Sequence, residues 1–475
     1  MQTTIRSAGL MILGVGLLAG GCATNSSTSW GSIKNPEVAA QLKSFVSEKE
    51  AQESKLVEAD EEDYAKENFK FKPPDFQPYF AAAKQGDWLT VSNLWEAMEE
   101  RGSSLTGTTN KYPHGMWLQP VRETGGAMKA FVYAGDKYSK IFGDDIIQSI
   151  PPGSIYFGGS DPGRFVVTAM CQSQVDADPF FVFTQNQLAD GSYLQYLRSM
   201  YEERIHIPSN EDLRESFQDY LADAQVRMKE NKLKPGEILK VEPNGSMQVS
   251  GQTAVMGINA LLAKIIFEEN SNREFYVEES FPLDWMYPYL EPHGLIFKLN
   301  RQPLSELSEE IVQRDHDYWT NCLAPMIGGW LNDDTTLEGV TAFVEKIFAR
   351  HDFSGFSGDP RFVGDEYWHA TFSTERCAIA DLYVWRAEHA ASDSEKKRMQ
   401  NEADFAFRQG WALCPVSPEA VYRYVNLLAN EGRISDAILV VHAALKMHQM
   451  GEYEARQVRS LLKQLEQMQQ QQSKK

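Results

Sequence analysis

A short apolar run that leads through two glycines into a helix start most constrains the fold of this chain. It is the stretch 153–164, with the sequence GSIYFGGSDPGR. Its apolar residues 155–157 predict a buried strand, and Gly158 and Gly159 can turn the backbone through angles closed to other residues. Asp161 can cap the next helix, with Pro162 at its first position, where a missing N–H costs nothing. The stretch therefore predicts a strand, a glycine turn and a helix.

Strand and helix patterns alternate over residues 137–302. Further apolar strands are expected at 179–184, 274–278 and 295–299, and a β-hairpin turned at Asn244-Gly245 is expected over 238–248. Helices are expected at 163–172, 193–201, 210–232 and 252–269, with a short one at 283–290. This alternation predicts an α/β domain that is three-layer and Rossmann-like, with a mostly parallel sheet.

Helical patterns dominate on both sides of this domain. Within residues 71–136, two patterns divided at Gln85-Gly86-Asp87 predict a helical hairpin. Residues 303–371 are expected to form a helical connecting region.

A tetratricopeptide-like pattern follows over residues 372–466. Ala403, Phe407 and Pro415 have the spacing that closes such a repeat, and Ala437 and Ala444 recur about one period of 34 later. Ala403, Phe407, Ala437 and Ala444 are expected at tight helix contacts. The Gln-rich end, 467–475, is expected to be a disordered tail.

Residues 1–21 have the pattern of a lipoprotein signal peptide. Arg6 precedes an apolar run, 8–19, that is too short to span a bilayer. Small residues then lead to Cys22, and this arrangement resembles the lipobox of bacterial lipoproteins, although the usual Leu is one position further back. Without Asp after the cysteine, the pattern resembles lipoproteins sent to the outer membrane. The alternative is an ordinary secretory signal with an incidental Cys22.

A linker and an acidic helical stalk are expected over residues 22–70. Residues 25–29 are Asn, Ser and Thr, as in a polar linker. Residues 36–68 are rich in Glu, Ala, Lys and Asp with few aromatics, which predicts a solvated helix with a poor core face and low order.

Charge and cysteine usage restrict the partners and cofactors. The formal net charge of -20 disfavours nucleic acid, because such a partner requires a basic face. No CxxC or Cys/His cluster with metal spacing is present, so we expect neither a metal nor another cofactor. The pairing of Cys171, Cys322, Cys377 and Cys414 stays open, and buried thiols are the simplest expectation.

Polar residues that follow the predicted strands form the candidate ligand site. Ligands of open α/β sheets usually bind at the carboxyl ends of the strands. The candidates are Gly158, Gly159, Ser160, Asp161, Arg164, Gln185, Asn186, Asp190, Glu278 and Glu279. Their side chains suit a sugar or polyol. The alternative is structural: Asp161 and Asp190 cap helices, and Arg164 pairs with a neighbouring carboxylate.

Other chemistries lack support in the sequence. Gly158 and Gly163 have the separation of a phosphate-binding loop, but Arg164 and Phe165 stand where Lys and Ser/Thr are needed. No GxSxG motif is present, and no residue is assigned a catalytic role.

Several phrases resemble a known family. Residues 154–165, Thr184-Gln185-Asn186 and residues 289–296 (YLEPHGLI) resemble the soluble part that follows the membrane helices in bacterial protein O-mannosyltransferase-like glycosyltransferases of the GT-C type. The similarity covers about 71–301. This chain has no counterpart of the multi-spanning region that carries the family's acidic catalytic residue. The resemblance therefore implies a relic or partner of a glycan-transfer system rather than a transferase.

Together these features predict a lipid-anchored periplasmic binding or assembly module for cell-surface glycan or protein glycosylation. Its expected partners are a membrane through the lipid and a protein through the helical repeats, with a glycan as a further candidate. Two alternatives remain open: a soluble glycan-acting enzyme at the strand ends, and a pure protein scaffold.

The anchor can be tested directly. Replacing Cys22 with Ser should leave an unprocessed precursor without lipid, because the acceptor thiol is missing. Metabolic labelling with radioactive palmitate measures this, and label that still enters the Ser variant would contradict the prediction.

Overall fold

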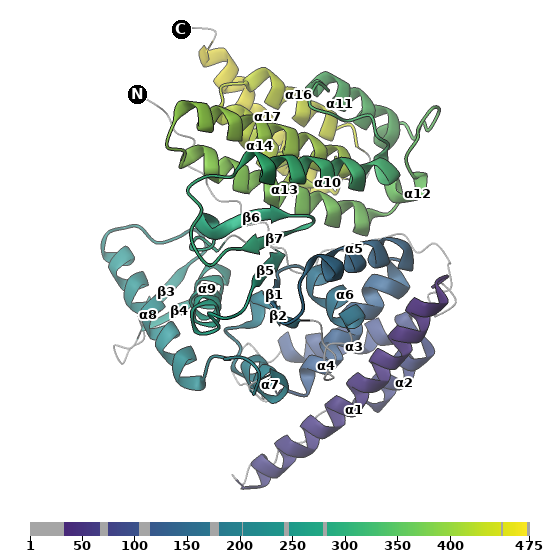
Figure 1. Cartoon of the computed structure of the whole chain (residues 1–475), viewed down its shortest axis with the longest axis vertical. Helices are drawn as coiled ribbons and strands as arrows, with labels where there is room; N and C mark the ends of the chain where they lie inside the picture. The colour runs from purple at the N-terminus through teal and green to yellow at the C-terminus, as the bar shows by residue number, and fades with distance from the viewer. Residues whose placement is uncertain are drawn as a thin grey trace. The chain divides into compact units, whose positions relative to one another are not determined.

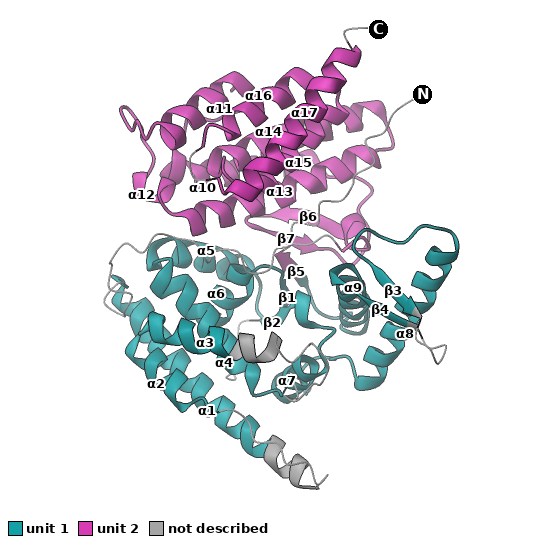
Figure 2. Cartoon of the chain, turned by 180° about the vertical axis from the view of Figure 1, so that it is seen from behind, with its two compact units in different colours: residues 1–275 teal, residues 276–475 magenta. Residues whose placement is uncertain are grey.

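The computed structural model describes residues 33–66, 75–103, 115–171, 180–201, 203–241, 247–278, 283–447 and 450–472. The chain divides into two compact units, residues 1–275 and 276–475 (Figure 2). The described part is mostly helical and contains one mixed five-stranded sheet, in the order β2-β1-β5-β7-β6, and one two-stranded sheet (Figure 1). Among the described helices, none combines the length and apolarity needed to cross a membrane.

The first unit contains most of the predicted alternation of strands and helices. Its helices are α1 (Pro36–Lys66), α2 (Gln77–Gln85), α3 (Trp88–Ser103), α4 (Leu118–Met128), η2 (Lys129–Tyr133), α5 (Asp136–Ser149), α6 (Asp161–Cys171), η3 (Gln185–Gln187), α7 (Gly191–Tyr201), α8 (Asn210–Lys229) and α9 (Gln252–Glu269). Its strands are β1 (Ile155–Gly158), β2 (Phe181–Thr184), β3 (Ile238–Val241) and β4 (Met247–Ser250), and β5 (Phe275–Glu278) begins at the boundary.

The second unit is helical after a short β-region. That region comprises η4 (Tyr287–Tyr289), β6 (Leu290–His293) and β7 (Ile296–Leu299). The helices are α10 (Glu309–Ile327), α11 (Leu337–Val344), η5 (Glu345–Ala349), α12 (Pro360–Val363), α13 (Glu366–Glu388), α14 (Asp393–Leu413), α15 (Pro418–Asn430), α16 (Ile434–Ala444) and α17 (Glu452–Gln472).

Strands β1 and β2 form the predicted parallel pair. Ile155 lies opposite Phe181 and Gly158 lies opposite Thr184. Every residue of both strands is buried, which explains their unbroken apolar sequences, because strands covered on both faces have no polar side. The predicted hairpin is also confirmed, since β3 and β4 pair antiparallel, although its Asn244-Gly245 turn lies outside the described residues.

The sheet is mixed, because β1 and β2 pair parallel whereas β6 and β7 pair antiparallel. The helix expected at 283–290 is wrong: residues 287–289 form a single 3-10 turn, and strand β6 begins at Leu290. β6 is the last strand in the sheet order, and an edge strand tolerates Pro292, which has no N–H to donate. The coarse expectation of an α/β part with helices before and after it holds.

Helix α1 corrects the expectation of a solvated stalk. It is helical as predicted, and it runs beside α2 (Figure 1). However, Leu42, Phe45 and Val46 are almost completely buried, as is the side chain of Lys49. The first half of α1 therefore has a core face and belongs to the packed body of the first unit.

The helical tail packs through the four residues predicted from its spacing. Ala403, Phe407, Ala437 and Ala444 are all buried, and each of the helices α13 to α17 packs on the next one in sequence. Gly432, with φ +78°, forms the turn between α15 and α16, in the left-handed region that favours glycine. The end differs from the prediction: residues 467–472 of the expected disordered tail belong to α17.

The cysteines agree with the expectation of buried thiols in part. Cys171, Cys377 and Cys414 are buried, whereas Cys322 is only half-buried. Burial raises the pKa of the Cys414 thiol to about 12, so it stays protonated and unreactive at neutral pH.

The packing of the tail can be tested at Ala437. Ala437→Glu places a carboxylate at a position with no exposed surface and should lower the free energy of unfolding by about 3 kcal/mol or more. Differential scanning calorimetry would show this as a lower melting temperature. His442→Glu, at an exposed position of the same helix, is the matched control. Equal melting temperatures for both variants would contradict the packing described here.

Candidate functional site

The candidate site lies at the carboxyl ends of β1 and β2. Because the strands are parallel with Gly158 opposite Thr184, the loops that follow them leave the sheet at the same edge. Asn186 joins the two loops directly, since its Nδ2 donates a hydrogen bond to the Gly159 carbonyl at 2.6 Å. The sequence-predicted residues from both strands are therefore brought together.

Gly158 is required by close packing rather than by the backbone freedom that the sequence predicted. Neither Gly158 nor Gly159 is among the residues with positive φ. A Cβ on Gly158 would instead lie 3.0 Å from the backbone of Arg164 and from the Gly163 carbonyl. The glycine therefore lets the first turn of α6 pack directly against the end of β1.

Ser160, rather than Asp161, caps helix α6. Ser160 Oγ accepts a hydrogen bond from the Gly163 backbone N–H at 3.0 Å, and Asp161 is already the first helical residue. The Asp161 side chain, 49% exposed, pairs with Arg164 at 2.9 Å and lies 3.9 Å from Lys129. The predicted pairing of Arg164 with a neighbouring carboxylate is thus confirmed, and a carboxylate in the first turn also suits the helix dipole.

The second loop is held by Asp190 and by a residue that the sequence analysis missed. Asp190 Oδ1 accepts hydrogen bonds from the Ser192 N–H and hydroxyl at 2.9 and 2.8 Å, so it caps α7 as its structural interpretation predicted. Asn259 of α9 accepts from the Ala189 N–H at 2.6 Å and donates to the Asn186 carbonyl at 3.0 Å. In the sequence, the sign of this role is that a single Asn lies within the otherwise apolar segment 254–263.

Polar atoms without partners gather in this cluster. Gln185 is completely buried, and neither its side-chain oxygen nor its nitrogen has a hydrogen-bond partner. Asn186 Oδ1 and Arg164 Nε are also buried without partners. An unpaired buried polar group costs about 1–3 kcal/mol, and such groups in native proteins call for an explanation.

The structure tests neither of the two glutamates expected at the site. Glu278 ends β5 and is buried, and it belongs to the second unit. Glu279 lies outside the described residues. The cluster consists of residues from the first unit alone.

Helix α1 supports both helices that start at the site. Gln41 Nε2 donates to the Ala169 and Met170 carbonyls, at 3.1 and 2.7 Å, near the end of α6. Lys49 Nζ lies 3.1 Å from the Tyr196 hydroxyl of α7 and pairs with Glu123 of α4. The expected stalk therefore helps to fix the geometry of the candidate site.

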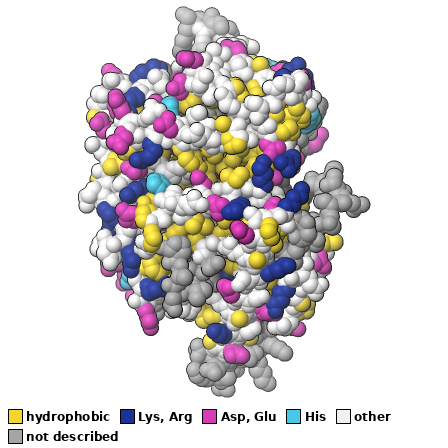
Figure 3. Space-filling model, turned by 45° about the vertical axis from the view of Figure 1, so that its right-hand side comes forward, with side chains coloured by type: hydrophobic (Ala, Val, Ile, Leu, Met, Phe, Trp, Pro, Cys, Tyr) yellow, Lys and Arg dark blue, Asp and Glu magenta, His cyan; other side chains and the backbone are white. Residues whose placement is uncertain are grey.

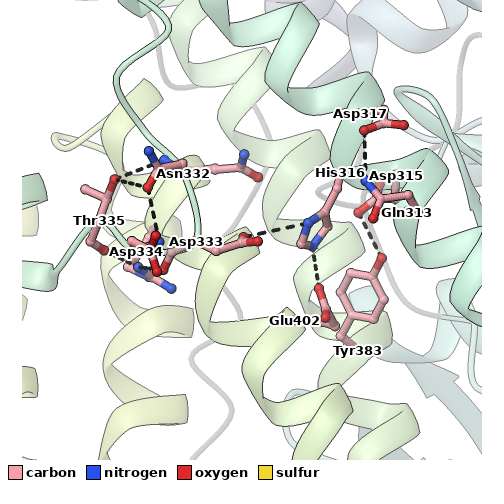
Figure 4. A network of polar contacts seen from close by, with 12 residues as sticks. Gln313, Asp315, His316, Asp317, Asn332, Asp333, Asp334, Thr335, Tyr383 and Glu402 are labelled. Atoms are coloured by element: carbon pink, nitrogen blue, oxygen red, sulfur yellow. Dashed lines mark hydrogen bonds and ion pairs between the residues drawn. The ribbon is translucent and has the colours of Figure 1, made fainter.

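A second polar network lies in the helical unit (Figure 4). Asp315 of α10 accepts hydrogen bonds from Arg376 and Tyr383 of α13, both at 2.8 Å. Arg376 Nε also donates to Gln409 of α14 at 2.7 Å. The side chains of Asp315 and Arg376 have no exposed surface. The neighbouring His316 contacts Glu402 and Asp333.

The described residues hold no cluster of metal ligands, and the surface charges are mixed. No group of three His, Cys, Asp or Glu among the described residues could hold a metal ion. On the face drawn in Figure 3, Lys and Arg side chains lie among Asp and Glu side chains.

Comparison with known proteins adds no relative. No family model, no curated protein and no solved structure matches this chain.

The cap assignment can be tested at two adjacent positions. Ser160→Ala should lower the free energy of unfolding by about 1 kcal/mol, because the Gly163 N–H loses its acceptor. Asp161→Ala removes an exposed ion pair and should cost no more than about 0.5 kcal/mol. Urea unfolding of both variants measures this. A larger loss of stability on replacing Asp161 than on replacing Ser160 would indicate that Asp161 is the cap.

Proposed function

We propose that this chain is a lipid-anchored binding or assembly module of the bacterial cell envelope, tethered at Cys22 on the periplasmic side of the outer membrane. Its ligand is a glycan, free or on a glycoprotein, bound where β1 and β2 end. The signal-peptide pattern and the glycosyltransferase resemblance support the setting. The main support for this binding site is the buried carboxamide of Gln185, which has no hydrogen-bond partner.

The chemistry of the cluster favours a neutral, hydroxyl-rich ligand. A carboxamide both donates and accepts hydrogen bonds, as a sugar hydroxyl does, so Gln185 and Asn186 can each complete their bonding with such a group. Arg164 pairs with Asp161, which offsets its charge, and Lys129 lies 3.9 Å from the same carboxylate. A phosphate would be repelled by this carboxylate, whereas an uncharged polyol would not.

Exposure increases from the interior to the surface across the cluster. Gln185 is fully buried, Asn186 is half-buried and Asp161 is exposed. A ligand would first meet Asp161 and Asn186 and would reach Gln185 by displacing the Asn186 side chain from the Gly159 carbonyl.

We also propose a finer description of the fold, in which helices cover both faces of the sheet in a three-layer, Rossmann-like arrangement.

A protein partner is the second proposed ligand, and the helical tail would bind it. The consecutive packing of α13 to α17 and the buried small residues support a tetratricopeptide-like array. A glycan-acting enzyme would need a carboxylate pair for acid and base chemistry, and in the described part of the cluster Asp161 and Asp190 are engaged in an ion pair and a helix cap.

The glycan proposal predicts opposite effects on stability and binding for one substitution. Gln185→Met keeps the length of the side chain and removes two buried unpartnered atoms, so it should raise the free energy of unfolding of the chain by about 1–3 kcal/mol. The same change should abolish glycan binding. A glycan array followed by isothermal titration calorimetry on any hit measures binding, and scanning calorimetry measures stability.

Gln119→Met is the matched control. Gln119 is a buried amide of α4 whose Nε2 is also unpartnered, so its replacement should leave binding unchanged. A glycan that binds the wild type and Gln185→Met equally would remove Gln185 from the site, and no hit on the array would remove the glycan proposal.

A further inference from the structure

His316 of α10 lies between two carboxylates from different segments of the helical unit (Figure 4). Its Nε2 lies 2.5 Å from Glu402 Oε2 on α14, and its Nδ1 lies 3.7 Å from Asp333 Oδ1 in the loop that joins α10 to α11. The ring also packs on Phe405, with 4.9 Å between the ring centroids. One imidazole thus connects two helices and a loop.

The loop, residues 328–336, makes further contacts with α14 and α11. Arg408 of α14 donates to the carbonyl oxygen of Thr335 and lies 3.4 Å from that of Asp333. Trp330 packs on Phe343 of α11, with ring centroids 4.3 Å apart. The Asp333 side chain is 70% exposed, so its ion pair with His316 adds a small, charge-dependent share to this attachment.

Charges from three elements act on His316. Glu402 of α14 and Asp333 of the loop face its two nitrogens, and Arg376 of α13 acts on it as a nearby positive charge. Burial alone would lower the pKa of His316, but the hydrogen bond with Glu402 and the two carboxylate charges outweigh burial and Arg376. The net effect is a raised pKa.

Three arginines of the neighbouring elements are paired with other carboxylates. Arg408 binds Asp404 on α14, Arg314 of α10 faces Glu291 of β6, and Arg361 of α12 faces Asp359.

We propose that His316 is a proton-operated clamp that fastens loop 328–336 to α10 and α14 in acid and loosens it as the pH rises. The imidazolium ion has two N–H donors, one for Glu402 and one directed toward Asp333. Neutral imidazole has a single N–H. When that hydrogen stays on Nε2 for Glu402, the lone pair of Nδ1 faces the Asp333 carboxylate and the attraction is lost.

The sign of the pH dependence follows from the raised pKa. The charged histidine is bound more strongly in the folded state, so its stabilising contribution is fully present below the unfolded value of about 6.5. The contribution is lost as the pH rises through the higher folded value. The stability contributed by His316 therefore falls as the pH rises, whereas that of a buried salt-bridged carboxylate falls as the pH drops. This proposal is independent of the ligand and the location of the protein.

Hydrogen–deuterium exchange of the full chain tests the clamp. After correction for intrinsic rates, amides of residues 328–336 should exchange about two- to five-fold faster at pH 8.5 than at pH 6, the range expected for an exposed ion pair. His316→Gln keeps one donor and cannot titrate, so its corrected exchange should not change with pH. Asp333→Asn should behave at both pH values like the wild type at pH 8.5.

Melting temperatures provide a second measurement that does not depend on the loop. Glu53 and Asp365, whose pKa values burial raises to about 7 and about 6, titrate in the same range, so the difference between wild type and His316→Gln is the relevant quantity. That difference should be largest below pH 6.5 and shrink as the pH rises. His442→Gln, an exposed histidine of α16, is the control and should show no such trend. A pH-independent difference, or loop exchange unaffected by His316→Gln, would overturn the proposal.

Discussion

The parallel register of β1 against β2 determines where the residues of the candidate site lie. With Gly158 opposite Thr184, the loops after both strands begin at one edge of the sheet, and Asn186 can reach the Gly159 carbonyl. A shift of one residue would turn the side chains of β2 to the opposite face of the sheet, because side chains alternate along a strand. The close contact of α6 with Gly158 adds a second constraint on the same edge. The site is thus a consequence of strand pairing and helix packing together.

The helical unit depends on a different constraint, the burial of opposite charges. Asp315 and Arg376 form an ion pair without exposed side-chain surface, and Tyr383 and Gln409 bond to it. Removing one charge from such a pair typically costs about 3–5 kcal/mol, because the other charge stays buried without a partner. Substitution of either residue would therefore disturb the contacts of three helices, α10, α13 and α14. The pair fixes how these helices meet, and it positions His316 beside it.

Local patterns predicted the elements, and long-range packing decided what the patterns could not show. β1, β2 and α9 were found because a run of apolar residues is a local signal. The core face of α1 was missed because it includes Lys49, whose charge is balanced by Glu123 from a distant helix. Ser160 and Asp161 cap helices about equally well, so only the packing of α6 against β1 selects Ser160. The unpartnered state of Gln185 is likewise a property of the folded neighbourhood.

The docking of α1 changes the geometry of the proposed attachment to the membrane. A free helix of 31 residues would raise the rest of the protein by about 46 Å, at 1.5 Å per residue. Because Ile33 is already buried and α1 packs on the body from Val38 onward, Cys22 is eleven peptide units from the packed chain, a length that could span at most about 40 Å. A lipid on Cys22 would therefore confine the whole first unit to a thin layer next to the bilayer. Ligands or partners within that layer would meet the protein at a high effective concentration.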